Sequence, residues 1–281
     1  MAMRERFQRM TVAAALAMVG LGLASCAGTP PTAGQAAQED RQSQVAQILR
    51  IAETTRRGGD LASAAGLYRR AHEMAPEQAA PLIALGETLM ALGAVGDGIQ
   101  AYALAVEREP ANADARYGYG RALMTVGRPR EAAEQFRAAM AARPKDARAY
   151  NGLGVALDQS GDHEAAQQVY LDGLELAPDN AGLSNNLAFS LLLAGEFNDA
   201  VARFEEIARQ STASRRHRQN LALAYGLAGD RAKAAAVAGQ DLGEEDVRNN
   251  LAAYERLRHL PAAERNAELL RLRESGPARI Q

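Results

Sequence analysis

One spacing constrains the fold of this chain more than any other feature. Glycine recurs every 34 residues without a slip, at Gly59, Gly93, Gly127, Gly161, Gly195 and Gly229. Proline follows the same period, at Pro76, Pro110, Pro144 and Pro178. A constant period of this length indicates a repeat array, in which each unit buries its apolar face against the next unit instead of in one closed core.

Small residues recur in the same register, at two places where helices would touch. With Pro76 as position 32, position 8 holds Ala52, Gly86, Gly120, Gly154, Ala188 and Ala222. Position 20 holds Ala64, Gly98, Ala132, Ala166, Ala200 and Ala234. Without long side chains the two helices of a unit can approach closely. An aromatic ring at position 24 then fills the space between neighbouring hairpins, as Tyr68, Tyr102, Phe136, Tyr170 and Phe204, whereas the sixth unit has Ala238.

The helix-ending residues fit this register. Glycine at position 15 suits the left-handed residue that follows a first helix, and proline at position 32 ends the second. A period of 34 is typical of the tetratricopeptide helical hairpin. We therefore predict an all-α fold, a tetratricopeptide solenoid of about six repeats with C-terminal capping helices. The alternative, an irregular helical bundle with chance periodicity, must account for six units in phase.

The N-terminus resembles a lipoprotein signal, predicted over residues 1–25. Three arginines precede an apolar run over 11–23 that is too short to span a bilayer. The run ends in Leu23-Ala24-Ser25-Cys26, which resembles a bacterial lipobox, and Cys26 is the only cysteine. A plain secretory signal is the alternative, but it would leave a free thiol in an oxidising compartment. The lipobox predicts lipidation at Cys26, and Ala27 after it favours the outer membrane.

The rest of the chain divides into four predicted parts. Residues 26–43 lack large apolar side chains and are expected to form a flexible tether, so that the first helix begins near Val45. The array covers 44–241. Residues 242–274 form capping helices, one over 246–259 and a charged, solvent-facing one over 262–273. Residues 275–281 form a loose tail.

Residues for catalysis are scarce, so we expect a protein without enzymatic activity, metal or cofactor. The four histidines are far apart in the sequence, and no His/Cys cluster or metalloprotease motif occurs. Gly118-Tyr119-Gly120 resembles part of a nucleotide-binding fingerprint, but it coincides with a packing position inside a helix. The net charge of −2 gives no indication of nucleic-acid binding.

The first helix of each repeat instead offers a wall for a protein partner. Positions 5 and 6 carry amides in the C-terminal half, at Asn151, Asn185, Asn186, Gln219, Asn220 and, in a displaced seventh helix, Asn249 and Asn250. An amide both donates and accepts, so a row of them can bind the backbone of an extended segment. Phe189 and Leu223 at position 9, with Val155 and Leu192 nearby, add an apolar strip. The alternative is that the amides cap turns or only solvate a surface.

Lipobox, tether, repeats and the closing stretch Val247 to Leu257 (VRNNLAAYERL) together resemble the TadD family, the tetratricopeptide lipoproteins of Flp/Tad pilus assembly. The resemblance implies an adaptor at the periplasmic face of the outer membrane that acts like a pilotin. It also implies a protein partner, the secretin or another pilus-assembly component. A tetratricopeptide lipoprotein of another envelope assembly or export machine remains the alternative. Genes encoding prepilin, secretin and a secretion ATPase nearby would separate the two.

Overall fold

The computed structural model describes residues 33–210 and 213–275. Within this part of the chain every regular element is an α-helix and no strand occurs. The signal segment 1–25, Cys26, the start of the tether and residues 276–281 of the tail lie outside it. Within the same part, no helix combines the length and the apolar composition needed to cross a membrane.

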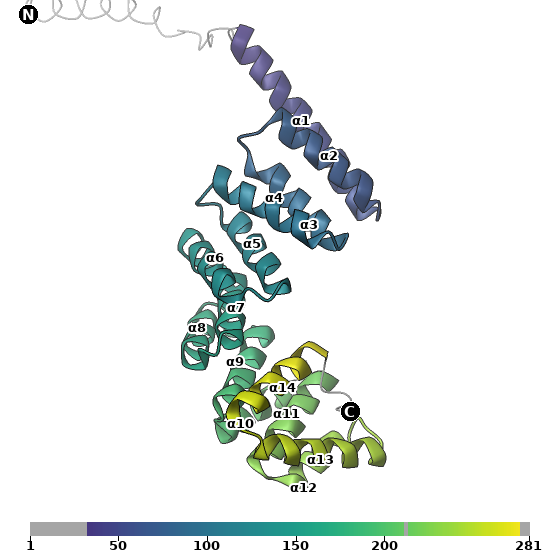
Figure 1. The fold of residues 1–281 in the computed structure, drawn as a ribbon, viewed down its shortest axis with the longest axis vertical. Helices are drawn as coiled ribbons and strands as arrows, with labels where there is room; N and C mark the ends of the chain where they lie inside the picture. Colours follow the sequence, from purple (N-terminus) through teal and green to yellow (C-terminus); the bar gives the residue numbers. More distant parts are fainter. Residues whose placement is uncertain (1–32, 211–212, 276–281) are drawn as a thin grey trace, which may run out of the picture. The chain divides into compact units, whose positions relative to one another are not determined.

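Six helical hairpins follow one another along the chain (Figure 1). They are α1 (Ala33–Arg57) with α2 (Leu61–Met74), α3 (Ala79–Ala91) with α4 (Val95–Arg108), α5 (Ala113–Thr125) with α6 (Pro129–Ala142), α7 (Ala147–Gln159) with α8 (His163–Leu176), α9 (Ala181–Ala194) with α10 (Phe197–Arg209), and α11 (Arg215–Ala228) with α12 (Arg231–Ala238). The first helices of hairpins two to six start 34 residues apart, and each hairpin packs on the next. The predicted solenoid is confirmed.

The recurring glycine makes the turn between the two helices of each hairpin. All six glycines at position 15 have a positive φ, between 69° and 90°, and no other residue of the described part does. An L-residue with a Cβ atom is strained in that conformation. The sequence period therefore has a backbone cause, because each hairpin needs one left-handed residue after its first helix.

Several glycines inside the helices make room for aromatic rings. A Cβ atom added at Gly120 would lie 2.8 Å from the Phe136 ring, and one added at Gly152 would lie 2.6 Å from the same ring. Gly120 belongs to the same hairpin as Phe136, whereas Gly152 belongs to the next hairpin. The ring at position 24 is thus held between two first helices, as the sequence predicts, and it joins neighbouring repeats.

Helix α1 begins earlier than expected. It starts at Ala33, not near Val45, so residues 33–43 of the predicted tether are helical. Every residue of that stretch with a described side chain is exposed, and the first buried residue is Val45. Alanine, glutamine and glutamate are good helix formers, so this stretch is helical although none of its described side chains is buried. The chain divides into two units, Met1–Gln44 and Val45–Gln281.

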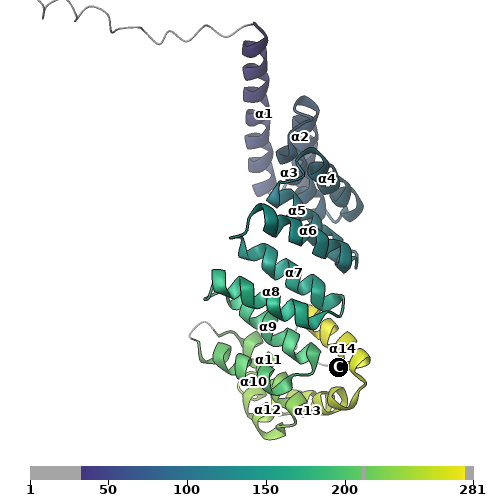
Figure 2. The same ribbon diagram turned by 90° about the vertical axis from the view of Figure 1, so that its left-hand side faces the viewer.

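Two further helices follow α12, namely α13 (Glu244–His259) and α14 (Ala262–Ser275). Helix α13 packs against α11 and α12, as the first helix of another repeat would. Helix α14 does not lie beside α13 as a second helix would, but returns to α9, two hairpins earlier (Figures 1 and 2). The expectation of a solvent-facing cap is therefore wrong for one face of α14, because Leu269 and Leu272 are buried there.

Candidate partner-binding wall

The asparagines at positions 5 and 6 bind one another between repeats. The Nδ2 atom of Asn186 donates to Oδ1 of Asn151 at 2.8 Å, and Nδ2 of Asn220 donates to Oδ1 of Asn185 at 2.9 Å. Each of these hydrogen bonds, which we call a rung, joins position 6 of one repeat to position 5 of the preceding repeat. We call Asn151, Asn185, Asn186 and Asn220 the amide row.

The amide row keeps hydrogen-bonding capacity after this pairing. An asparagine side chain has two N–H donors and an oxygen with two lone pairs, so one rung uses only part of each side chain. Asn151, Asn185 and Asn186 are half-buried, whereas Asn220 is 4% exposed. Three neighbouring amides can therefore still reach a partner, while Asn220 holds the row in place from beneath.

The sequence predicts that the row continues beyond Asn220, but in the structure it ends there. Gln219 is buried, and its Nε2 atom lies 3.5 Å from Asp241, whose carboxylate is held by Arg218. Asn249 is exposed, but Asn250 is buried at 1% exposure. Neither Oε1 of Gln219 nor Nδ2 of Asn250 has a hydrogen-bond partner, so the third rung is not formed. The interpretation of Gln219 and Asn250 as open wall residues is wrong, because both are covered.

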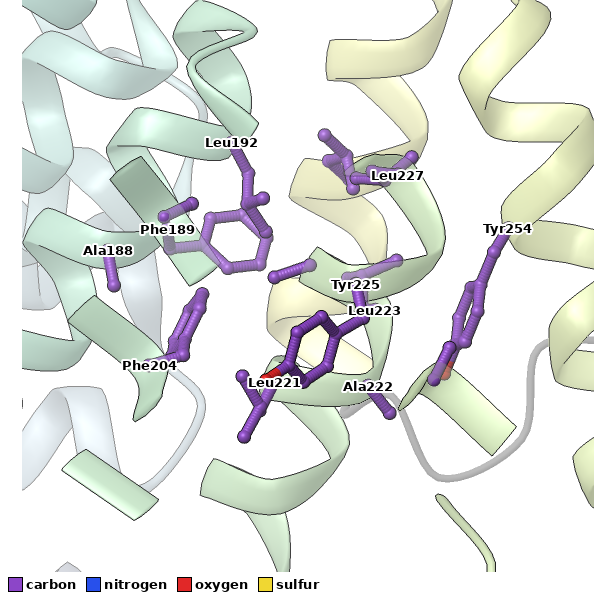
Figure 3. Close-up of a cluster of buried hydrophobic side chains, with 14 of the residues drawn as sticks. Ala188, Phe189, Leu192, Phe204, Leu221, Ala222, Leu223, Tyr225, Leu227 and Tyr254 are labelled. Carbon is purple, nitrogen blue, oxygen red and sulfur yellow. The ribbon is translucent and has the colours of Figure 1, made fainter. Parts of the chain in front are cut away.

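The predicted apolar strip is present, but it is covered. Phe189, Leu192 and Leu223 are 2% exposed or less, and they form one buried cluster with Leu269 and Leu272 of α14. Figure 3 shows Phe189 and Leu192 of α9 beside the residues of α11. Because α14 lies over this strip, Phe189 and Leu223 do not face solvent beside the amide row, contrary to the expectation from sequence.

A buried carboxylate, not expected from the sequence, lies next to the strip. Asp158 of α7 is 1% exposed and accepts hydrogen bonds from Oγ of Ser190 at 2.7 Å and Oη of Tyr170 at 3.1 Å. Nδ1 of His163 is 3.1 Å from the same carboxylate. Burial, and then the charge of Asp158, raise the pKa of Tyr170 well above its usual value, so the phenol is a donor.

One signal in the sequence could have identified Asp158. It occupies position 12, where the preceding repeat has Met124 and the following one has Leu192. A charged residue at a position that is otherwise apolar in its neighbours needs a partner if it is buried. Here that partner is Arg273 of α14, whose Nη1 atom is 3.5 Å from Oδ2 of Asp158.

The N-terminal repeat has a different surface. Glu53 is bonded by Nε of Arg56 at 2.9 Å, by Arg57 at 2.8 Å and by Oη of Tyr68 at 3.0 Å. The hydrogen bonds from Arg56 are the main reason that the pKa of Glu53 is lowered to about 2. Glu53, Arg56 and Arg57 therefore form an ion-pair network within the protein.

Comparison with known proteins decides the repeat family. A tetratricopeptide repeat model matches residues 49–113, 83–125 and 117–181. Residues 49–181 of the chain are built from tetratricopeptide repeats. No curated protein is similar enough in sequence to count as a match.

Solved structures with this fold include PilF, PilW and a protein of Parabacteroides merdae. PilF of Pseudomonas aeruginosa is 20% identical, with a TM-score of 0.61 over 72% of this chain and 91% of its own. PilW, a widely conserved type IV pilus biogenesis factor, is 20% identical, with a TM-score of 0.63 over 70% and 91%. A tetratricopeptide repeat protein of Parabacteroides merdae is 16% identical, with a TM-score of 0.66 over 83% and 93%. At these identities the likeness establishes the fold.

Tetratricopeptide repeat proteins are generally scaffolds for protein interactions. In residues 33–210 and 213–275, no group of three histidine, cysteine or carboxylate side chains is placed to hold a metal ion. The arrangement that the tetratricopeptide repeats do provide is a row of partly exposed, hydrogen-bonding amides, which is suited to binding a protein segment.

Proposed function

We propose that this tetratricopeptide repeat protein is a lipid-anchored adaptor for pilus assembly at the periplasmic face of the outer membrane. Its amide row would hold an extended segment of a partner, and the secretin of a Flp/Tad machine is the partner we propose. The observation that carries the proposal is the row itself, in which Asn151, Asn185 and Asn186 come from two neighbouring first helices and stay half-exposed.

Two further observations support the pilus assignment. The fold resembles those of PilF and PilW, and PilW is a type IV pilus biogenesis factor. The sequence Leu23-Ala24-Ser25-Cys26 resembles a lipobox, which would place the repeats in the envelope. An acyl chain contributes about 0.8 kcal/mol per buried CH₂, so two or three chains would hold the protein firmly at the membrane.

One hydrogen-bonded pair of the amide row can be removed without leaving an orphaned polar group. Asn151→Ala together with Asn186→Ala deletes both partners of one rung, and such double replacements cost little stability. The matched control is Gln168→Ala with Asp172→Ala, which deletes an exposed hydrogen-bonded pair of α8. Both variants are expected to melt within about 2 °C of each other.

Capture of the secretin then tests the proposal. The amide double variant is expected to retain the secretin at least fivefold less well than the control in a pull-down from solubilised envelopes. In cells, deletion of the gene should leave the secretin unassembled and the surface without pili. Equal secretin capture by the two variants would rule out the amide row, and normal piliation of the deletion strain would rule out the adaptor role.

A further inference from the structure

Helix α14 occupies the apolar strip with a single face. The residues that it turns inward are Arg265, Asn266, Leu269, Leu272 and Arg273, which recur with the spacing of one side of a helix. Leu269 is fully buried and Leu272 is 6% exposed. On the opposite side Glu264, Ala267 and Arg271 are exposed. The strip therefore already binds an amphipathic helix, and that helix belongs to the same chain.

Each polar residue of this face meets a defined group on the repeats. The guanidinium of Arg273 lies 5.7 Å from the centre of the Phe189 ring, next to the Asp158 carboxylate. The guanidinium of Arg265 lies 5.2 Å from the Phe197 ring. Nδ2 of Asn266 is 3.2 Å from Nε2 of His163. Recognition thus combines two leucine contacts with a cation at a buried carboxylate.

The fit of α14 is incomplete in its polar contacts. Nε of Arg265, Oδ1 of Asn266 and Nη1 of Arg273 are buried without a hydrogen-bond partner. The 3.5 Å between Arg273 and Asp158 is also longer than a good charge-assisted hydrogen bond. A buried donor or acceptor that lost water without gaining a partner opposes binding. A helix that satisfied these groups would therefore bind the same surface more tightly.

The position of α14 also makes it easy to displace. It has little packing against α13, its neighbour in the chain, and it is joined to α13 only through Leu260 and Pro261. A 14-residue helix is marginal in water by itself, so α14 depends on the strip for its structure. When α14 leaves, Asp158 still keeps its bonds from Ser190, Tyr170 and His163.

We propose that the surface under α14 is a second docking site, for an amphipathic helix of a partner protein with the pattern Leu-x-x-Leu-Arg, and that α14 holds its place until the partner arrives. This inference rests on the proposed function only in that the occupant is a protein. The partner must bring a cation, because removal of Arg273 leaves a buried carboxylate without an opposite charge. Arginine fits better than lysine, because it can also stack on the Phe189 ring.

The test uses a labelled peptide with the sequence of residues 262–275, AAERNAELLRLRES, as the stand-in helix. Leu269→Asp with Leu272→Asp in the full-length chain releases α14, and Ala267→Asp on its exposed face is the matched control. In wild type the tethered helix competes at a high effective concentration. The peptide should therefore bind the release variant at least tenfold more tightly than it binds wild type or the control, as measured by fluorescence anisotropy.

The peptide itself tests the arginine. Changing the arginine that corresponds to Arg273 to glutamate should weaken binding to the release variant at least tenfold. No binding to a folded release variant, or equal binding of the two peptides, would overturn the proposal. A dimer of the release variant or wild type in light scattering would mean that a second copy is the natural occupant, which also overturns it.

Hydrogen exchange of the wild-type protein covers the case in which the release variant does not fold. The amides of α14 should exchange at least tenfold faster than the buried amides of α9 and α11, and faster still with excess peptide. Exchange of α14 together with α9 would show a permanent part of the fold and would overturn the proposal. None of these measurements involves a pilus, so they can succeed even if the deletion strain is normally piliated.

Discussion

The packing of rings against glycines predicts that adding one methyl group inside a repeat will destabilise the protein. In Gly154→Ala the new Cβ atom would lie 2.3 Å from Cε1 and 2.5 Å from Cζ of Tyr170. The ring cannot move away easily, because it is fully buried and its hydroxyl is bonded to Asp158. Overpacking of this kind costs about 1–3 kcal/mol, and we expect the upper half of that range.

The same substitution also brings a gain, which a matched control measures. Alanine is more favourable than glycine in a helix by about 0.8–1.0 kcal/mol. Gly66 lies within α2, and a Cβ atom there would meet nothing within 4 Å. Gly66→Ala should therefore stabilise the protein by about that amount, whereas Gly154→Ala should destabilise it by about 1–2 kcal/mol net.

Thermal unfolding followed by circular dichroism distinguishes the two variants. For a protein of this size about 1 kcal/mol corresponds to a change of roughly 2–4 °C in Tm, so Gly154→Ala should melt about 2–8 °C below wild type. Gly66→Ala should melt slightly above it. If Gly154→Ala stabilises the protein as much as Gly66→Ala, the ring does not pack against that glycine, and the account of how repeats are joined is incorrect.

Three other changes give distinct results. Gly161→Val places a β-branched residue at a φ of +86° and should cost about 1–2 kcal/mol in a denaturant titration, whereas an unchanged midpoint would contradict the left-handed turn. The pKa of Glu53 is lowered from 4.5 to about 2, so the ionised carboxylate stabilises the fold above pH 4.5, and this stabilisation is lost as the pH falls toward 2. Glu53→Gln should remove that part of the acid dependence of stability. Identical acid-unfolding profiles of wild type and variant would refute this prediction. Cys26→Ser should move the protein from the membrane fraction to the soluble periplasm or leave it uncleaved, and a wild type without an acyl label would refute the anchor.

The hairpins could be predicted from the sequence, because each repeat needs the same few residue types at the same positions. The positive φ of Gly161 and the contact of Phe136 with two glycines both follow from spacing alone. The start of α1 could not be predicted from the sequence, because no packing contact marks it. Residues 33–43 are helical through their intrinsic preference, and the low hydrophobicity used to predict a tether reports burial, not helix formation.

The residues of the wall could be predicted from the sequence, but their contacts could not. The register places Asn151 and Asn186 on neighbouring helices, but whether they bind each other or a partner depends on side-chain rotamers, which a period does not specify. The covering of Phe189 by α14 could not be predicted either, because it joins segments about 80 residues apart and α14 has no counterpart in the repeats. The apolar face of α14, with Leu269 and Leu272, was the only available signal.

Photo-crosslinking in living cells tests the adaptor function most directly. A benzophenone amino acid is introduced in place of Asn185, on the amide row, and in a second strain in place of Arg137, an exposed residue of α6. The account predicts that Asn185 captures the secretin subunit and that Arg137 does not. Capture of the secretin equally at both positions, or its absence at Asn185 in a strain that assembles pili, would contradict the account.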